Sequence, residues 1–124
     1  MKPAALLLLL LPALALAQGP TRTVEIEWGE ARRFEAEQTL APGHTVEACT
    51  PLEKTQQVHW TFHADGNLSF ALFHRIGKRP IYAERRQRTR SLQGAFNPQQ
   101  AVRHCWSWTN AGPQTVQMAF MLRH

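Results

Sequence analysis

The amino-acid sequence predicts an all-β fold, an antiparallel β-sandwich of about seven or eight strands in a jelly-roll-like arrangement. Three observations lead to this class. Apolar residues recur at every second position in most segments after residue 20, which is the period of a half-buried strand. Clusters of Gly, Pro, Asn and Asp interrupt these segments at intervals of about eight to twelve residues, as turns do in sandwiches. No segment shows helical periodicity.

A predicted secretory signal peptide occupies residues 1–17. Lys2 supplies a positive start, residues 6–11 are all leucine, and Ala15-Leu16-Ala17 is a small-residue cleavage motif. The apolar run is shorter than the roughly 20 residues that cross a bilayer. We therefore expect cleavage after Ala17, a periplasmic or secreted location, and one soluble domain over residues 18–124 without a transmembrane segment.

Three strands are predicted in the first third of the domain. Residues 24–28 alternate apolar and acidic side chains, and residues 34–37 resume the alternation more weakly. A Pro-Gly turn within residues 41–43 leads to a third strand at residues 44–49. Its small apolar side chains share one face, and Cys49 lies on the other.

The middle of the chain predicts a β-hairpin with a three-residue loop at residues 65–67. Residues 58–62 and 68–72 each place apolar side chains at every second position around this Asp-Gly-Asn sequence. Opposed residues of an antiparallel pair lie on the same face of the sheet. A three-residue loop pairs Phe62 with Phe70 and keeps both apolar rows on the core face, whereas a two-residue loop would separate them.

The second half of the domain predicts an edge strand, an exposed loop and three further strands. Residues 81–82 form the short edge strand, and residues 84–90 form the loop because they include no apolar side chain. Residues 92–96, 102–109 and 115–122 show the period of two again.

The two cysteines, Cys49 and Cys105, are predicted to form a disulfide. Export places them in an oxidising compartment, where two cysteines in a small domain most often pair. Closing a loop of this length stabilises the fold by about 4 kcal/mol in the chain-entropy model. The alternative is two free thiols that bind copper or carry out redox chemistry, for which the sequence lacks a Cys-x-x-Cys spacing.

The sequence Cys-Trp-Ser-Trp-Thr-Asn at residues 105–110 resembles the late cysteine element of GOLD domains. These are β-sandwiches from the lumenal part of cargo receptors in the early secretory pathway. Their late Cys-aromatic-x-Asn element bonds to an earlier cysteine and follows a hairpin with a Gly-containing turn and a Tyr-bearing edge segment. Cys49, residues 65–67, residues 68–73 and residues 81–82 follow the same order here. The resemblance covers roughly residues 44–122 and implies a GOLD-like binding module, closer to soluble proteins of bacterial envelopes than to cargo receptors.

A basic segment at residues 75–90 is the candidate binding site. It holds seven basic residues against one acid, Glu84, so its net charge is +6. Export argues against nucleic acid as the partner and favours lipid head groups, anionic glycans or an acidic protein face. The alternative is a solvated basic hairpin loop without a partner. The candidate residues are Arg75, Lys78, Arg79, Arg85, Arg86, Arg88 and Arg90.

The histidines and methionines raise an alternative function, a periplasmic copper-type metal-handling protein. His59 and His63 lie about 13 Å apart if they share a strand, which is too far for one ion. Met118 and Met121 are soft ligands, but Met118 belongs to the apolar row of the last strand. We therefore predict no metal site and no cofactor. The six histidines are His44, His59, His63, His74, His104 and His124.

Catalytic patterns are weaker still. Ser69 and Ser107 lack a Gly-x-Ser-x-Gly turn, the glutamates of the first strands alternate outward, and no Gly-rich phosphate loop is present. The sequence thus predicts a non-enzymatic exported module that binds a protein or an anionic envelope component.

Overall fold

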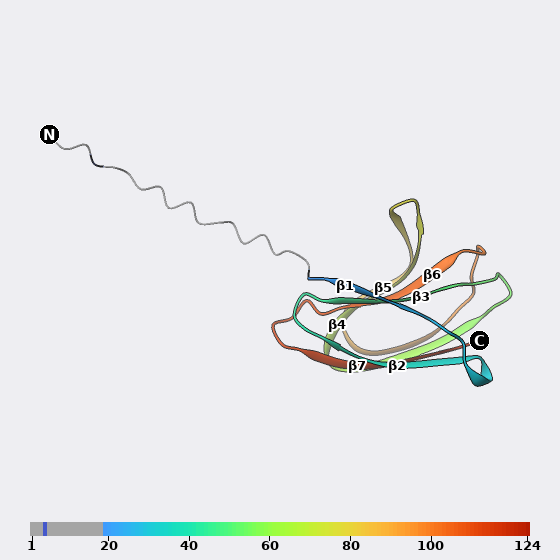
Figure 1. Cartoon of the computed structure of the whole chain (residues 1–124), viewed down its shortest axis with the longest axis horizontal. Helices are drawn as coiled ribbons and strands as arrows, with labels where there is room; N and C mark the ends of the chain where they lie inside the picture. Colours follow the sequence, from blue (N-terminus) through green and yellow to red (C-terminus); the bar gives the residue numbers. More distant parts are fainter. Residues whose placement is uncertain (1–3, 5–18) are drawn as a thin grey trace.

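The computed structural model describes Ala4 and residues 19–124, and the domain is built on one seven-stranded β-sheet (Figure 1). Apart from Ala4, the predicted signal peptide and its cleavage site lie outside the described residues. The described residues contain one short 3₁₀ turn, η1 (Glu30–Arg32), and no α-helix. The strands are β1 (Thr21–Glu25), β2 (Arg33–Leu40), β3 (Thr45–Pro51), β4 (Val58–Ile76), β5 (Arg79–Phe96), β6 (Arg103–Thr109) and β7 (Val116–Arg123).

The strand order is β1-β3-β6-β4-β7-β2, and β5 pairs with the other edge of β4. This confirms the all-β class, and the seven strands fall within the predicted number. Strictly antiparallel pairing was wrong in one place, because β1 and β3 run parallel. A parallel pair needs a long crossover connection. Strand β2 supplies it by crossing to the far end of the sheet before the chain returns as β3.

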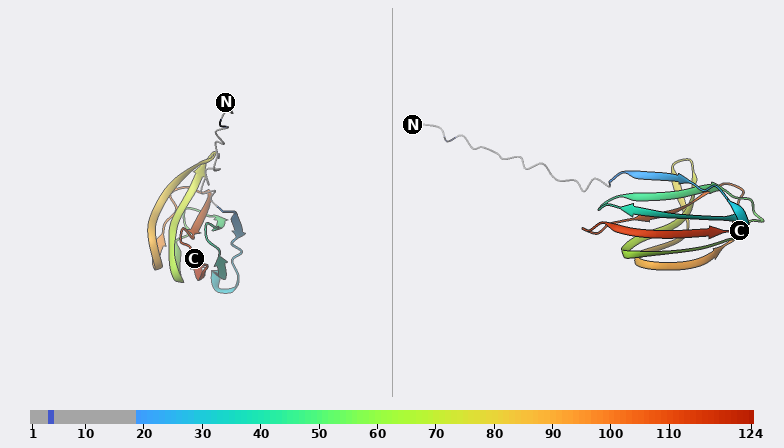
Figure 2. Two further views of the ribbon diagram at one scale, coloured as in Figure 1. Left: turned by 90° about the vertical axis from the view of Figure 1, so that its left-hand side faces the viewer. Right: turned by 60° about the horizontal axis from the view of Figure 1, so that its bottom comes forward.

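Strand β4 is continuous, so the predicted hairpin at residues 65–67 was wrong. Its residues 59–64 pair with β7, and its residues 69–74 pair with β6 on the same edge. Phe62 therefore lies opposite Phe120, and Phe70 lies opposite Trp108. Because two strands share one edge of β4, the sheet divides there and curls over itself (Figures 1 and 2).

The bend of β4 uses the Asp-Gly-Asn sequence that had predicted a turn. Six residues of β4, from His63 to Leu68, face only three of β5, which is an irregularity of the kind that bends a strand. The Asp65 carboxylate accepts a hydrogen bond from the Gln117 backbone N–H of β7 at 2.9 Å. A Cβ on Gly66 would lie 2.7 Å from a methyl of Val116, so a larger residue does not fit here. Turn-forming residues thus produce a bulge within a strand.

Strand β5 includes residues 84–90, so the predicted exposed loop was also wrong. Glu84 lies opposite Leu72 and Arg86 lies opposite Phe70 in the β4–β5 ladder. The segment lacks apolar residues because β5 is an edge strand, and charges on an edge prevent pairing with other chains. A further irregularity, with Arg88 at φ 53°, interrupts the ladder here. The connection is the two-residue turn Gly77-Lys78, in which Gly77 has φ 63°.

The core lies inside the curl and is dominated by aromatic side chains. Trp108 of β6 stacks on Phe120 of β7 with ring centroids 4.6 Å apart, which joins the two arms of the curled sheet. Trp60 and Phe70, from the two halves of β4, stack at 4.8 Å. Gly94 of β5 lies opposite Trp60, where a Cβ would approach the indole ring to 2.6 Å. Both tryptophans of β6, Trp106 and Trp108, are fully buried in this core.

Asn110, the last residue of the GOLD-like element, has a structural role. Its side chain is fully buried and donates hydrogen bonds to the carbonyls of Leu40 at 2.9 Å and Gln114 at 2.7 Å. Its side-chain oxygen accepts a hydrogen bond from the Gly112 N–H at 3.0 Å. Asn110 therefore ties the β2–β3 connection to the β6–β7 connection.

We expect Phe62→Ala and Phe70→Ala each to lower the free energy of unfolding by about 3–5 kcal/mol, the usual cost of a large aromatic lost from a core. Their ring centroids are 5.3 Å apart across the bend, so the double variant should depart from additivity. Urea denaturation of the three variants measures this. Phe34→Ala, at a half-buried position, is the control and should cost less. Simple additivity with small losses would contradict this packing.

Candidate functional site

The predicted disulfide is present and lies beneath the β4–β5 hairpin. Cys49 of β3 and Cys105 of β6 are directly opposed, with Cα atoms 4.1 Å apart. Both are buried, and they pack with Phe73 of β4 in a small cluster outside the main core. Glu47 lies beside the two sulfurs, but sulfurs bonded to each other are not thiolate ligands for a metal. The alternative of two free thiols was therefore wrong.

An aromatic and cationic platform extends from this disulfide along the hairpin. The Phe73 and Tyr82 rings pack with centroids 5.9 Å apart. The Arg85 guanidinium lies 4.2 Å from the Tyr82 ring centroid, and that of Arg75 lies 4.7 Å from the Phe73 ring centroid. Arg75 also forms an ion pair with Glu47 at 2.9 Å, which links the hairpin to β3. Stacked guanidinium groups are held in place while their charge stays exposed.

The end of the hairpin, residues 75–82, projects from the body of the domain (Figure 1). The pairing of β4 with β6 ends at His74, so Arg75 and Ile76 pair only with β5. Ile76 is 56% exposed and Tyr82 is 43% exposed. They are the two exposed large hydrophobic residues of the described part of the chain. We call residues 75–82 together with Arg85 the hairpin tip.

The structure divides the seven predicted basic residues into two groups. Arg75, Lys78, Arg79 and Arg85 belong to the hairpin tip. Arg86, Arg88 and Arg90 follow along the edge strand, where Arg86 forms an ion pair with Glu84 at 3.3 Å and Arg90 donates to the Asp65 carbonyl at 3.4 Å. Ile76 and Tyr82 were not predicted as exposed binding residues from the sequence. The Gly77-Lys78 pair between two extended segments was the pattern that could have located the turn beside them.

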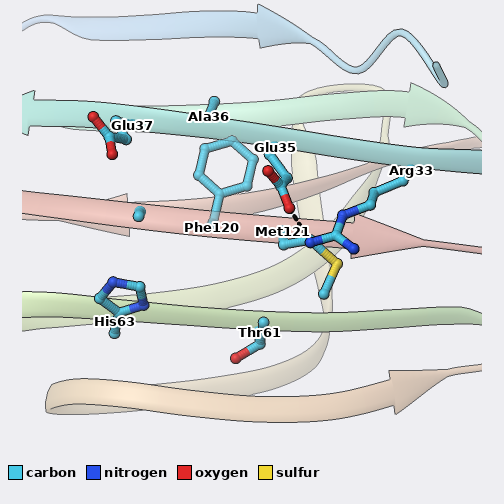
Figure 3. A pocket seen from close by; sticks show the side chains of 9 residues that line it. Arg33, Glu35, Ala36, Glu37, Thr61, His63, Phe120 and Met121 are labelled. Carbon is cyan, nitrogen blue, oxygen red and sulfur yellow. Dashed lines mark hydrogen bonds and ion pairs between the residues drawn. The ribbon is translucent and has the colours of Figure 1, made fainter. Parts of the chain in front are cut away.

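A shallow groove runs over the outer face of β2, β7 and β4 (Figure 3). It exists because Ala119 of β7 is small and lies between Glu37 of β2 and His63 of β4, its cross-strand neighbours. An ion pair joins Arg33 to Glu35 at one end. Within the described residues, no hydrogen bond connects Thr61 or His63 to a carboxylate. The groove thus has polar groups but does not assemble a nucleophile and base.

The histidines are distributed over both faces of the sheet. His59 and His63 lie on the outer face with the groove. His74 of β4 and His104 of β6 are directly opposed in the ladder, at the end of the row formed by Phe70 with Trp108 and Leu72 with Trp106. Their ring centroids are 5.3 Å apart. The pairing could not be predicted, because the sequence did not show that β4 and β6 are neighbours.

The surroundings of His104 favour its neutral form. It is only 2% exposed, and its Nδ1 lies 2.8 Å from the Val102 carbonyl oxygen. Burial lowers the pKa of His104 below 6.5, partly offset by this hydrogen bond, and the neighbouring His74 lowers the pKa further.

The comparisons with known proteins show similarity of fold. No protein-family model matches the chain, and no curated protein matches it in sequence. PliG, a periplasmic inhibitor of g-type lysozyme from Aeromonas hydrophila, superposes with a TM-score of 0.59 at 13% identity, covering 83% of this chain and 96% of the inhibitor. The pre-peptidase C-terminal domain of a collagenase from Bacillus anthracis gives 0.61 at 8% identity, over 84% and 95%. A mitogen from Yersinia pseudotuberculosis gives 0.56 at 11%, over 73% and 84%.

At these identities the similarity establishes the β fold alone. The disulfide fits a protein from an oxidising compartment, and PliG is a periplasmic protein of similar fold. The described residues contain no helix with the length and apolarity that a membrane crossing requires.

We expect the protein to lose stability as the pH falls below about 6.5, because the unfolded chain then binds a proton that buried His104 resists. The loss should continue down to the lowered pKa of the folded state. Urea denaturation at about pH 7.5 and about pH 5.5 measures it. A His104→Leu variant should show a smaller pH dependence, and an exposed-face control, His59→Gln, should behave like the wild type. Equal pH dependence in all three proteins would contradict the assignment to His104.

Proposed function

We propose that the protein is an exported, non-enzymatic binding module whose hairpin tip docks on an acidic face of another protein. The observation that carries this proposal is that Ile76 and Tyr82, the exposed large hydrophobic residues of the described chain, both lie on the projecting hairpin among basic residues, one on each of its faces. Protein interfaces are built in this way, with aromatic and arginine anchors at their centre. A projecting hairpin suits a concave partner surface.

The packing of aromatic and arginine side chains within and below the tip supports the same role. Arg85 on Tyr82 and Arg75 on Phe73 are ordered by stacking, and the disulfide packs against Phe73. Side chains that are fixed before binding lose less conformational entropy when a partner arrives. The positive charge of the tip would attract an acidic partner, and this attraction would weaken as the salt concentration rises.

The GOLD-like interpretation of the domain belongs to this proposal. The disulfide from an early cysteine to the Cys-Trp-Ser-Trp-Thr-Asn element supports it, whereas the hairpin at residues 65–67, which was part of the resemblance, is a bulge in one strand. PliG, a periplasmic inhibitor of g-type lysozyme, is an example of a similar fold in a protein that acts on another protein.

An anionic lipid head group or glycan is the alternative partner. Such a surface would respond to charge along the whole of β5, including the edge group of Arg86, Arg88 and Arg90. A protein that docks on the tip would respond to the tip alone. The two classes of partner can therefore be distinguished by removing two positive charges either from the tip or from the edge group and comparing the loss of binding.

We expect Lys78→Gln with Arg79→Gln, at the tip, to abolish binding of an acidic envelope protein, while Arg88→Gln with Arg90→Gln leaves it nearly intact. Each variant removes two positive charges from the β4–β5 hairpin, so the two are matched. A third variant, Ile76→Ser with Tyr82→Ala, should also lose binding. Exposed ion pairs contribute only about 0–1 kcal/mol, so melting temperatures should change little. Binding is measured by retention of one identified protein from an envelope extract and by its salt dependence.

Cosedimentation with phosphatidylglycerol vesicles distinguishes the alternative. The proposal predicts that the tip and edge variants do not differ in vesicle binding. Equal loss of partner binding in both charge variants, or retention of the partner by the Ile76→Ser, Tyr82→Ala variant, would contradict docking at the tip.

A further inference from the structure

We propose that His74 and His104 form a zinc-binding pair at the end of the core. This site is separate from the hairpin tip and differs from the copper-type site considered from the sequence, since it uses neither methionine. It follows from the ladder between β4 and β6, which places the two imidazoles directly opposite each other. Opposed residues of adjacent strands are close enough for their side chains to meet.

The ring positions suit a tetrahedral ion. A zinc ion bound at roughly 2.0–2.1 Å from an imidazole nitrogen lies roughly 3.2 Å from the ring centroid. Two rings at a tetrahedral angle then have centroids roughly 5.2 Å apart, and two at the right angle of a square-planar Cu²⁺ site roughly 4.5 Å apart. The observed separation is 5.3 Å, which agrees with the tetrahedral value.

Each of the two histidines has an imidazole nitrogen that is available as a zinc ligand. The Nδ1 of His104 is engaged with the Val102 carbonyl oxygen, which fixes the tautomer and leaves Nε2 as the ligand atom. A backbone carbonyl in this position is the usual support of a metal-binding histidine. The Nε2 of His74 is buried and has no hydrogen-bond partner among the described residues. A buried polar atom without a partner is costly, and a bound ion would satisfy it.

The position of the pair also agrees with a metal site. His74 is only partly buried, so the pair lies at the edge of the core and not at its centre. Two histidine nitrogens would leave the remaining positions of a tetrahedral ion to water or to a group from a partner.

Isothermal titration of untagged protein with Zn²⁺ tests the proposal. The protein is kept oxidised, because free Cys49 and Cys105 would bind zinc themselves. We expect one ion per chain. A His74→Gln variant should bind at least about tenfold more weakly, since even the loss of an outer hydrogen-bond partner costs about 10–100-fold in metal affinity. The matched control, His59→Gln with His63→Gln, removes two exposed histidines and should bind as the wild type does.

A second measurement covers the case in which His74→Gln does not fold. Zinc added to the wild type should shift the imidazole NMR signals of two histidines, assigned to His74 and His104, and leave the other four unchanged. Absence of binding, undiminished binding in a folded His74→Gln variant, or shifts at His59 and His63 would each overturn the proposal.

Discussion

The bend in β4 is the constraint on which the rest of the structure depends. The first half of β4 pairs with β7 and its second half pairs with β6, and both partners lie on the same edge of β4. The sheet can therefore curl only if β4 changes direction between His63 and Leu68. The irregular ladder, Gly66 against Val116, and the hydrogen bond from Gln117 to Asp65 produce this change. Once β4 bends, Phe62 and Phe70 meet and the aromatic core closes.

The same bend places the hairpin that we propose as the binding surface. Because β4 leaves the body past His74, its end and the start of β5 have no other strand beside them. Such an arm needs support, and the disulfide supplies it by fixing β3 to β6 under Phe73. The arrangement of the hairpin tip depends on this support, because Tyr82 packs on Phe73 and Arg85 stacks on Tyr82. The disulfide therefore contributes to the shape of the proposed site as well as to stability.

Features that depend on local periodicity were predicted correctly from the sequence. Features that depend on which strands pair with each other were not. The core rows of β4, β6 and β7 and the Cys49–Cys105 pair were all found. A hairpin with a three-residue loop and a continuous strand both keep the alternate apolar residues from Val58 to Leu72 on one face of the sheet. The alternation therefore could not distinguish the two structures. The sequence of residues 84–90 predicts a loop and not a strand, because an edge strand carries charges in place of an apolar row. The His74–His104 pair depends on which strands are neighbours, which no local pattern contains.

Amide hydrogen exchange along β5, followed by NMR, tests the continuous β4–β5 hairpin most directly. In the structure residues 84–92 pair with β4 on one side only, so N–H groups that point towards β4 are bonded and those on the open edge are not. The account predicts slow exchange at roughly every second residue of this segment, interrupted near Arg88. Uniformly fast exchange from residue 84 to residue 90 would mean that this segment is a loop, and it would contradict both the bent strand and the supported hairpin tip.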